Sequence, residues 1–150
     1  MPKLSSQPAT FAALDKLGTE TLLLFIHPDR RPLAGAAALV DWRLCGALSQ
    51  ALMDGGLTGK VGEQLMMPTH HRVGSTRLIL RGAGPIGEKL SKAELEEALK
   101  AAHRAGAEDL GVQLPENIAD DGALQALKAY PGQKICVVGP PPGLQNKLGS

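Results

Sequence analysis

Short apolar runs separate longer amphipathic segments along this chain, and the alternation predicts its strands and helices. Residues 21–26 form one nearly continuous apolar run between Gly18 and Pro28. An apolar run of this length is typical of a strand that is buried on both faces. Similar runs predict further strands at 10–14, 64–67, 77–81, 110–114 and 134–138.

The segment that follows residue 35 repeats apolar residues every three or four positions, as one face of a helix does. Leu44, Leu48 and Leu52 follow this spacing, and we expect all three to be buried against the sheet. Asp54 and the two glycines after it tolerate left-handed backbone, so they are expected to end this helix.

Two more helices are expected in the second half of the chain. Ser91 and Glu94 have the spacing of a capping box, and Gly106 is placed to end the helix that they begin. Asp121 is expected to cap a shorter helix, which Pro131 and Gly132 close.

Together these elements predict an α/β domain in which helices cover a mixed sheet of about six strands. Residues 9–138 contain all of the predicted elements and are assigned to this domain. Residues 1–8 are polar and are expected to form a flexible N-terminus, and residues 139–150 a Pro- and Gly-rich extended tail.

Composition excludes several classes of protein. The chain has 150 residues, of which 43% are hydrophobic, the size and balance of one globular domain. Only 3% are aromatic and the net charge is +1, which argues against single-stranded nucleic acid, duplex DNA and membranes as partners. The apolar runs are too short to span a bilayer. Cys45 and Cys136 form no disulfide framework, so we expect a reduced, cytoplasmic protein.

Residues 82–87 spell the G-x-G-x-x-G pattern of dinucleotide-binding turns. In such sites the helix begins within the motif, so that its free amides meet the pyrophosphate. Here the expected helix cap is Ser91, and Pro85 has no amide to offer. A glycine-permitted turn at the end of a strand is therefore the simpler interpretation. The candidate ligand-binding residues are Gly82, Ala83, Gly84 and Gly87.

Basic residues concentrate between 60 and 92, and acidic residues between 93 and 121. Arg77 and Arg81 are an even number of positions apart on one predicted strand, so they point to the same side. Because the other basic residues come from several loops and the total charge is nearly neutral, a solvated rim is favoured over a nucleic-acid surface. The candidates for an anion-contact surface are Lys60, Arg72, Arg77 and Arg81.

No group of residues has the spacing of a catalytic or metal site. Gly59 and Lys60 lack the flanking glycine and the Ser or Thr of a phosphate-binding P-loop. His70 and His71 are adjacent in a predicted loop, with no cysteine or carboxylate at ligand spacing. We therefore expect no catalytic residue, no bound metal and no cofactor.

Several short segments occur in an order that is found in a known family. They are Leu33-Ala34-Gly35, Asp41, the stretch 44–48, the stretch 56–63 with its G-K-V-G-E turn, and the stretch 77–84, where a strand ends in a glycine-rich turn. In this order they resemble the N-terminal domain of the leucine (cytosol) aminopeptidase family, over most of the chain. The resemblance implies a macro-domain-like fold with three layers, α/β/α.

The resemblance also indicates what this chain lacks. In that family the peptidase chemistry belongs to a larger C-terminal domain with two metal ions, a lysine and a carboxylate-rich motif of the type N-T-D-A-E-G-R, and no such run is present here. The chain looks like the accessory domain without the catalytic one. Related macro domains bind ADP-ribose through an asparagine-bearing strand end and a glycine-rich phosphate loop, and neither is evident.

We therefore expect a non-catalytic accessory domain for protein interaction or assembly, with a protein partner or a second copy of the chain as its target. Two alternatives stay open. One is a macro-type module that binds a small nucleotide or ADP-ribose-like ligand at 82–87, and the other is a DNA-contacting regulatory domain that uses the basic segment.

Overall fold

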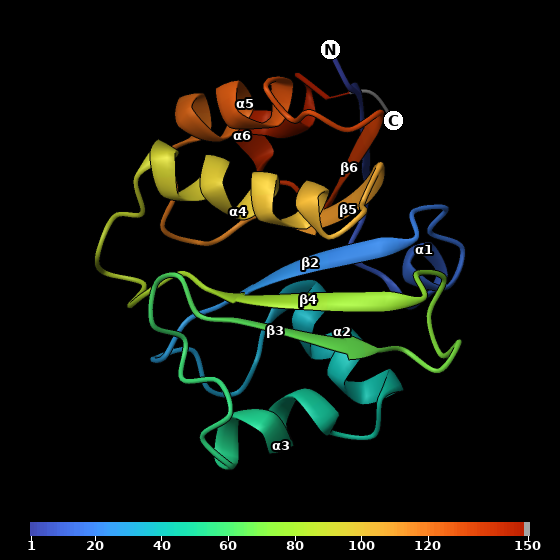
Figure 1. Cartoon of the computed structure of the whole chain (residues 1–150), viewed down its shortest axis with the longest axis vertical. Helices are drawn as coiled ribbons and strands as arrows, with labels where there is room; N and C mark the ends of the chain where they lie inside the picture. Colours follow the sequence, from blue (N-terminus) through green and yellow to red (C-terminus); the bar gives the residue numbers. More distant parts are fainter. Residues whose placement is uncertain (149–150) are drawn as a thin grey trace.

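One six-stranded sheet organises the protein, whose computed structural model describes residues 1–148 (Figure 1). The strands are β1 (Lys3–Gln7), β2 (Thr21–Ile26), β3 (Gln64–Pro68), β4 (Arg77–Gly82), β5 (Asp109–Gln113) and β6 (Lys134–Val138). They lie in the order β1-β6-β5-β2-β4-β3. Every neighbouring pair is parallel except β3 and β4, so the sheet is mixed, as predicted.

Helices cover both faces of this sheet. On one face lie α1 (Phe11–Asp15), α2 (Gly35–Arg43) and α3 (Ala47–Met53), and on the other lie α4 (Lys92–Arg104), α5 (Asp120–Lys128) and α6 (Pro142–Gln145). Figure 1 shows α4 and α5 on one side of the sheet and α2 and α3 on the other. The predicted three-layer α/β/α fold is confirmed.

The central strand β2 separates two apolar cores. Successive side chains of a strand point to opposite faces of its sheet. Leu23 and Phe25 pack with α4 and α5, whereas Leu22, Leu24 and Ile26 pack with the helices of the opposite layer. Every residue of β2 is buried, which confirms the strand predicted from its apolar run.

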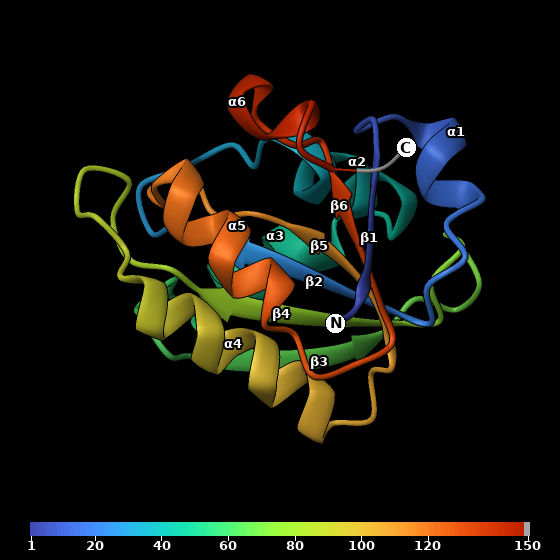
Figure 2. The ribbon, with the colours of Figure 1, turned by 90° about the horizontal axis from the view of Figure 1, so that it is seen from above.

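The first strand lies upstream of its predicted position. Residues 10–14 belong to α1 and its cap, because Thr10 Oγ1 accepts a hydrogen bond from the Ala13 amide at 3.1 Å, so the strand predicted there is wrong. The strand is β1, which occupies the polar segment for which a flexible N-terminus is predicted. It pairs with β6 along its whole length (Figure 2).

The Pro- and Gly-rich C-terminal segment also differs from its prediction. Instead of running on as an extended tail, residues 142–145 form α6, with a proline in its first turn. Leu144 in this helix is buried in the core that α4 and α5 share. Residues 149–150 of the predicted tail lie outside the described residues.

The helix predicted across residues 40–52 is two helices, α2 and α3. The break follows Leu44, where Cys45 has φ +56° and Gly46 has φ +86°. Left-handed backbone cannot continue a right-handed helix, so the chain turns a corner here. Leu44 and Leu48 are buried, as predicted, whereas Leu52 is only partly buried.

The two predicted caps have different outcomes. Ser91 is the N-cap of α4, and its hydroxyl oxygen accepts a hydrogen bond from the Glu94 amide at 3.1 Å, as predicted. Asp121 lies inside α5 rather than at its cap, because that helix starts two residues earlier than predicted, with Ala119 as the N-cap. Acidic residues in the first turn still favour the positive end of the helix dipole.

We expect Leu48→Ala to lower the free energy of unfolding by about 2–5 kcal/mol, because it opens a cavity in a fully buried position. The matched control is Leu52→Ala in the same helix, which removes a side chain that is only partly buried. Chemical denaturation measures both. An equal loss in the two variants would contradict the assignment of Leu48 to the centre of this core.

Candidate functional site

The glycine-rich turn that follows β4 packs against the loop that precedes β3. The Gly84 amide donates to the Gly59 carbonyl oxygen at 2.9 Å. A Cβ atom at Gly82 would lie 2.0 Å from the Lys60 carbonyl oxygen, so this close approach requires glycine. The protein's own backbone therefore fills the space beside the turn.

Two polar side chains join this turn to the loops after β2 and β5. His27 Nε2 accepts a hydrogen bond from the Glu116 amide at 3.1 Å, so the ring proton is on Nδ1, which donates to the Gly84 carbonyl oxygen at 2.8 Å. Asn117 Nδ2 donates to three carbonyl oxygens of the turn and the residues after it, those of Ala83, Pro85 and Glu88. The carboxyl ends of three strands are thereby held together.

Most amides of the turn already have acceptors within the protein. The Gly82, Ala83 and Gly84 amides donate to backbone carbonyl oxygens. The Ile86 amide donates to the Asp29 carboxylate at 3.0 Å. Phosphate sites at such turns depend on free amides. An anion would have to displace protein groups here, and ligand binding by these residues stays a prediction.

Gly87, the remaining ligand candidate, borders a small hollow of about 270 Å³ together with Ile86, Lys89 and Asn117. Within residues 1–148, Asn117 Oδ1 is buried and has no hydrogen-bond partner. Exchanging the oxygen and nitrogen atoms of this amide would not remove the unpaired group, because Nδ2 donates to three carbonyl oxygens where it now lies.

The loop before β3 also resembles an anion site, but the protein supplies the anion. Glu63 Oε1 accepts hydrogen bonds from the Thr58 hydroxyl at 2.7 Å and from the amides of Thr58, Gly59 and Lys60 at 2.8–2.9 Å. These bonds, that of the Thr58 hydroxyl foremost, hold the pKa of the Glu63 carboxyl below its ordinary value. The G-K-V-G-E turn is thus a closed structural unit.

Arg77 and Arg81 point to the same side of β4, toward the α4 layer, as their even spacing predicts. Arg77 Nε donates to Thr21 Oγ1 at 2.7 Å, and Arg81 Nη1 donates to Gln64 Oε1 at 2.8 Å. Arg81 is only 8% exposed, and burial lowers the pKa of its guanidinium, an effect that the acidic residues of α4 oppose. Both side chains are engaged in packing the sheet.

The other two basic candidates lie elsewhere. Arg72 Nη1 lies 3.1 Å from Cys45 Sγ, at the corner between α2 and α3 on the opposite layer. Lys60 belongs to the loop that Glu63 closes. The structure therefore separates the four candidates, and no single surface contains all of them.

Within residues 1–148, no three His, Cys, Asp or Glu side chains gather closely enough to hold a metal ion. His70 and His71 both have positive φ, in the connection between β3 and β4. None of the helices in the described part of the chain combines the length and the apolar character needed to cross a bilayer.

An apolar groove at the corner between α2 and α3 was not evident from the sequence. It has a volume of about 680 Å³, and its largest side chain is Trp42, which is 75% exposed. The remaining lining residues are Pro32, Leu33, Ala38, Asp41, Cys45, Gly46 and Ser49. The sequence signal was the single tryptophan, which lies off the apolar stripe of its helix. We call this feature the Trp42 groove.

The wall of the Trp42 groove is held by the cap of α3. Asp41 Oδ1 accepts hydrogen bonds from the Leu48 and Ser49 amides at 2.9 and 3.1 Å. The other carboxylate oxygen accepts from the Ser49 hydroxyl. One side chain of α2 thus caps α3 and fixes the angle between the two helices.

The Glu63 loop gives the fold an acid-sensitive element. The pKa of Glu63 is lower in the folded state than in the unfolded state, where it is about 4.3. The stabilisation of the fold by this carboxylate is therefore complete above about pH 4.3, and it is lost as the pH falls through the folded-state pKa. We expect Glu63→Gln to weaken the acid dependence of the unfolding free energy. Denaturation at a series of pH values measures it, with Glu88→Gln as the exposed control. Identical pH profiles for wild type and Glu63→Gln would contradict the assigned role.

Comparison with known proteins agrees with this description. The model of the cytosol aminopeptidase family, N-terminal domain, matches residues 13–130. A probable cytosol aminopeptidase of Pseudomonas syringae pv. tomato is 39% identical over 83 residues, covering 55% of this chain and 16% of the relative. A probable cytosol aminopeptidase of Azotobacter vinelandii is 35% identical over 104 residues, covering 67% of this chain and 21% of the relative. The chain thus spans about a fifth or less of the length of these relatives.

Solved structures with low sequence identity share the fold. The macrodomain of Mycobacterium tuberculosis DarG superposes with a TM-score of 0.64 at 15% identity, covering 94% of this chain and 99% of that one. A tomato leucine aminopeptidase mutant superposes with a TM-score of 0.60 at 16% identity, covering 97% of this chain and 35% of that one. The family model matches most of this chain, and the chain has a macrodomain-like fold. This chain therefore belongs to the cytosol aminopeptidase family and corresponds to its N-terminal domain.

Proposed function

We propose that this chain is a non-catalytic accessory domain that acts through protein interaction or assembly in the cytosol, with the Trp42 groove as its contact surface. The partner is a protein surface that presents an apolar side chain to the groove, a second copy of this chain included. The observation that carries the proposal is the exposure of Trp42 beside that groove.

Exposure of this tryptophan is costly to a domain that stays alone. Large aromatic side chains are enriched in the centres of protein interfaces, and tryptophan is prominent among the residues whose truncation weakens binding most. The chain has only one tryptophan, and other aromatic residues, such as Tyr130, are buried in the core. Burial of Trp42 by a partner would remove this apolar surface from water.

The groove is also preorganised. Because Asp41 fixes the α2–α3 corner, the groove wall has its shape before a partner arrives. A preformed wall reduces the ordering cost of binding. The lining contributes one carboxylate, Asp41, and that group is already committed to the cap of α3. An apolar contact therefore suits the groove better than a charged one.

A small-ligand role is the second candidate, and a different hollow favours it. A cavity of about 350 Å³ lies at the carboxyl ends of β5 and β6, between the start of α2 and Pro141. Open α/β sheets bind ligands at this edge. The charged residues that line the cavity are Glu116 and Asp120. Arg30 binds both carboxylate oxygens of Glu116, at 2.9 and 2.6 Å, so Asp120 is the carboxylate that remains for a ligand that donates hydrogen bonds.

We expect Trp42→Ser to weaken complex formation by at least about tenfold, because tryptophans at interface centres contribute roughly 2 kcal/mol or more. Self-association is measured by sedimentation velocity. Proteins from source cells that bind to this chain are identified, and each is then purified and tested again for complex formation.

The matched control is Met66→Thr. Met66 is also an exposed apolar residue, but it lies on the edge strand β3. Its strand neighbours Leu65 and Met67 point to the other face of the sheet, where they pack against the core beneath α2 and α3. Circular dichroism confirms that both variants fold. Equal complex formation by wild type and Trp42→Ser, or an equal loss in both variants, would overturn the Trp42 groove as the contact surface.

We also expect no aminopeptidase activity from this chain, with zinc or manganese supplied. Amide hydrolysis by a metal pair needs several converging carboxylate and nitrogen ligands. The family match is confined to the N-terminal domain of the relatives. Release of a chromophore from a leucyl amide measures the activity, with a complete cytosol aminopeptidase as the positive control. Turnover that disappears on addition of a chelator, in a preparation free of host peptidases, would show the non-catalytic assignment to be wrong.

A further inference from the structure

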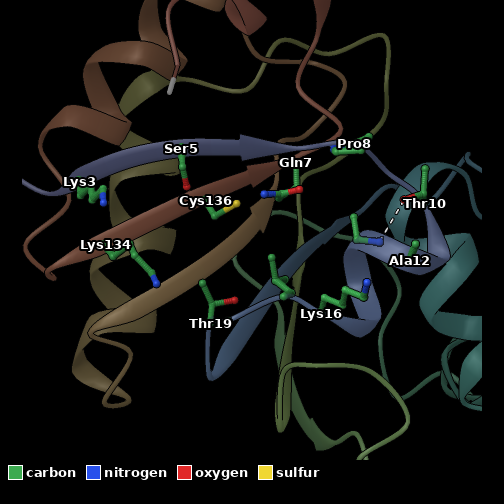
Figure 3. A pocket seen from close by; sticks show the side chains of 13 residues that line it. Lys3, Ser5, Gln7, Pro8, Thr10, Ala12, Lys16, Thr19, Lys134 and Cys136 are labelled. Carbon is green, nitrogen blue, oxygen red and sulfur yellow. Dashed lines mark hydrogen bonds between the residues drawn. The ribbon is translucent and has the colours of Figure 1, made fainter. Parts of the chain in front are cut away.

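A hollow of about 610 Å³ lies over one face of the β1–β6 pair, next to α1 (Figure 3). Three lysines line it from three different elements: Lys3 on β1, Lys16 after α1 and Lys134 on β6. The lining includes Ser5, Thr19 and Cys136, and no carboxylate. We call it the lysine hollow.

The hollow exists because α1 is too short to cover this part of the sheet. Helix α1 has five residues and buries only Leu14. The side chains that β1 and β6 present to this face include Ser5 and Cys136, which are neighbours in the strand register and are both small. Because these side chains are small and no helix covers them, a hollow remains above this face of the sheet. The other face of the same strands packs against the core beneath α5.

The register of the two strands places like charges side by side. Lys3 and Lys134 are paired neighbours in parallel strands, which lie about 4.8 Å apart. The next residues, Leu4 and Ile135, both face the opposite core, so the two lysines point to the same face. Like charges at such positions destabilise a sheet unless something compensates them.

Compensation within the protein is incomplete. Among residues 1–148, none of the three lysines has a carboxylate oxygen within 4.0 Å. Asp15, next to Lys16, is engaged by Arg43 at 2.7 Å. Asp109 continues the row on β5, beside Lys134, and balances one positive charge of the three. The hollow therefore keeps a net positive charge.

The side of the hollow that faces the strand pair holds a hydroxyl group at a fixed position. Thr19 is 2% exposed, and its hydroxyl is held 3.3 Å from the Ser75 hydroxyl. Figure 3 shows Thr19 and Lys16 on the side of the hollow opposite Ser5 and Cys136. Ammonium groups on the rim with hydroxyl groups inside form a set of donors that suits phosphoryl oxygens.

We propose that the lysine hollow binds a small anion with two or more phosphoryl groups. Lys3 and Lys134 lie together on the strand pair, whereas Lys16 lines another side of the hollow, so an anion with two phosphoryl groups suits the three lysines better than a single phosphate does. The same chemistry is presented by an inorganic oligophosphate and by a nucleoside diphosphate or triphosphate, and the experiment below separates these two sources. The site is independent of the Trp42 groove, which lies at the α2–α3 corner.

The experiment titrates the whole chain with inorganic tripolyphosphate, ADP and adenosine by calorimetry, and follows backbone amide shifts by NMR. We expect tripolyphosphate to bind, with shifts centred on β1, Lys16, Thr19 and Cys136. The double variant Lys3→Gln/Lys134→Gln should bind at least about tenfold more weakly, as expected when two charge contacts are lost. Lys100→Gln, an exposed lysine on α4, should bind as wild type does.

A second readout needs no ligand. Because the double variant removes repulsion between neighbouring strands, its melting temperature at low ionic strength should equal or exceed that of wild type, and added salt should reduce the difference. Tighter binding of ADP than of tripolyphosphate, lost in the double variant, identifies a nucleotide as the source of the phosphoryl groups. Equal or weaker binding of ADP identifies an oligophosphate.

Four results would overturn the proposal. Three are absence of tripolyphosphate binding by the folded chain, equal binding by wild type and the double variant, and shifts confined to residues outside the lysine hollow. Binding of duplex DNA that tripolyphosphate cannot displace would assign these lysines to a nucleic-acid surface and would also overturn it.

Discussion

The two-sided burial of β2 is the constraint on which the rest of the fold depends. All six of its residues are buried, so both faces of the sheet must be covered and both backbone edges must be paired. Parallel neighbours on either side require crossover connections, and these connections are the helices that supply the cover. The two helical layers and the two separate cores follow from this one strand.

The carboxyl end of the sheet follows from the same constraint. Where β2, β4 and β5 end, their loops leave a buried sheet and need partners for backbone groups that the sheet no longer pairs. His27 and Asn117 supply them, and the glycines after β4 let the neighbouring loop come close enough to close the edge. Two glycines of the G-x-G-x-x-G pattern, Gly82 and Gly84, therefore serve packing in this chain. The pattern identified a strand-end turn correctly, but it does not distinguish that use from phosphate binding.

The elements that could be predicted from the sequence are those whose signal lies in their own residues. β2 and β6 carry apolar runs, and α4 carries its own cap and stripe. β1 is polar and pairs on one side, so its signal lies in its partner β6 rather than in itself. The break at Cys45 could not be predicted, because a cysteine carries no preference for positive φ.

The same rule holds for the candidate functional sites: the parts that could be predicted are those whose signal lies within one short segment of the sequence. The turn at Gly82 and Gly84 was recognised, but the groups that close it come from segments far away in the sequence, including Gly59, His27 and Asn117. The basic cluster of the sequence is separated in space, whereas Lys3 and Lys134, at opposite ends of the chain, become neighbours. Exposure of Trp42 likewise depends on the angle between two helices that were predicted as one.

The two outermost strands also affect how copies of the protein can meet. β3 ends in Pro68, which has no amide to donate, and β1 is a short polar strand that carries Lys3. Proline and lysine at the border of a sheet oppose the addition of a strand from another molecule. Open-ended stacking of chains into a fibre, the characteristic hazard of exposed strand borders, is therefore hindered at both margins of the sheet.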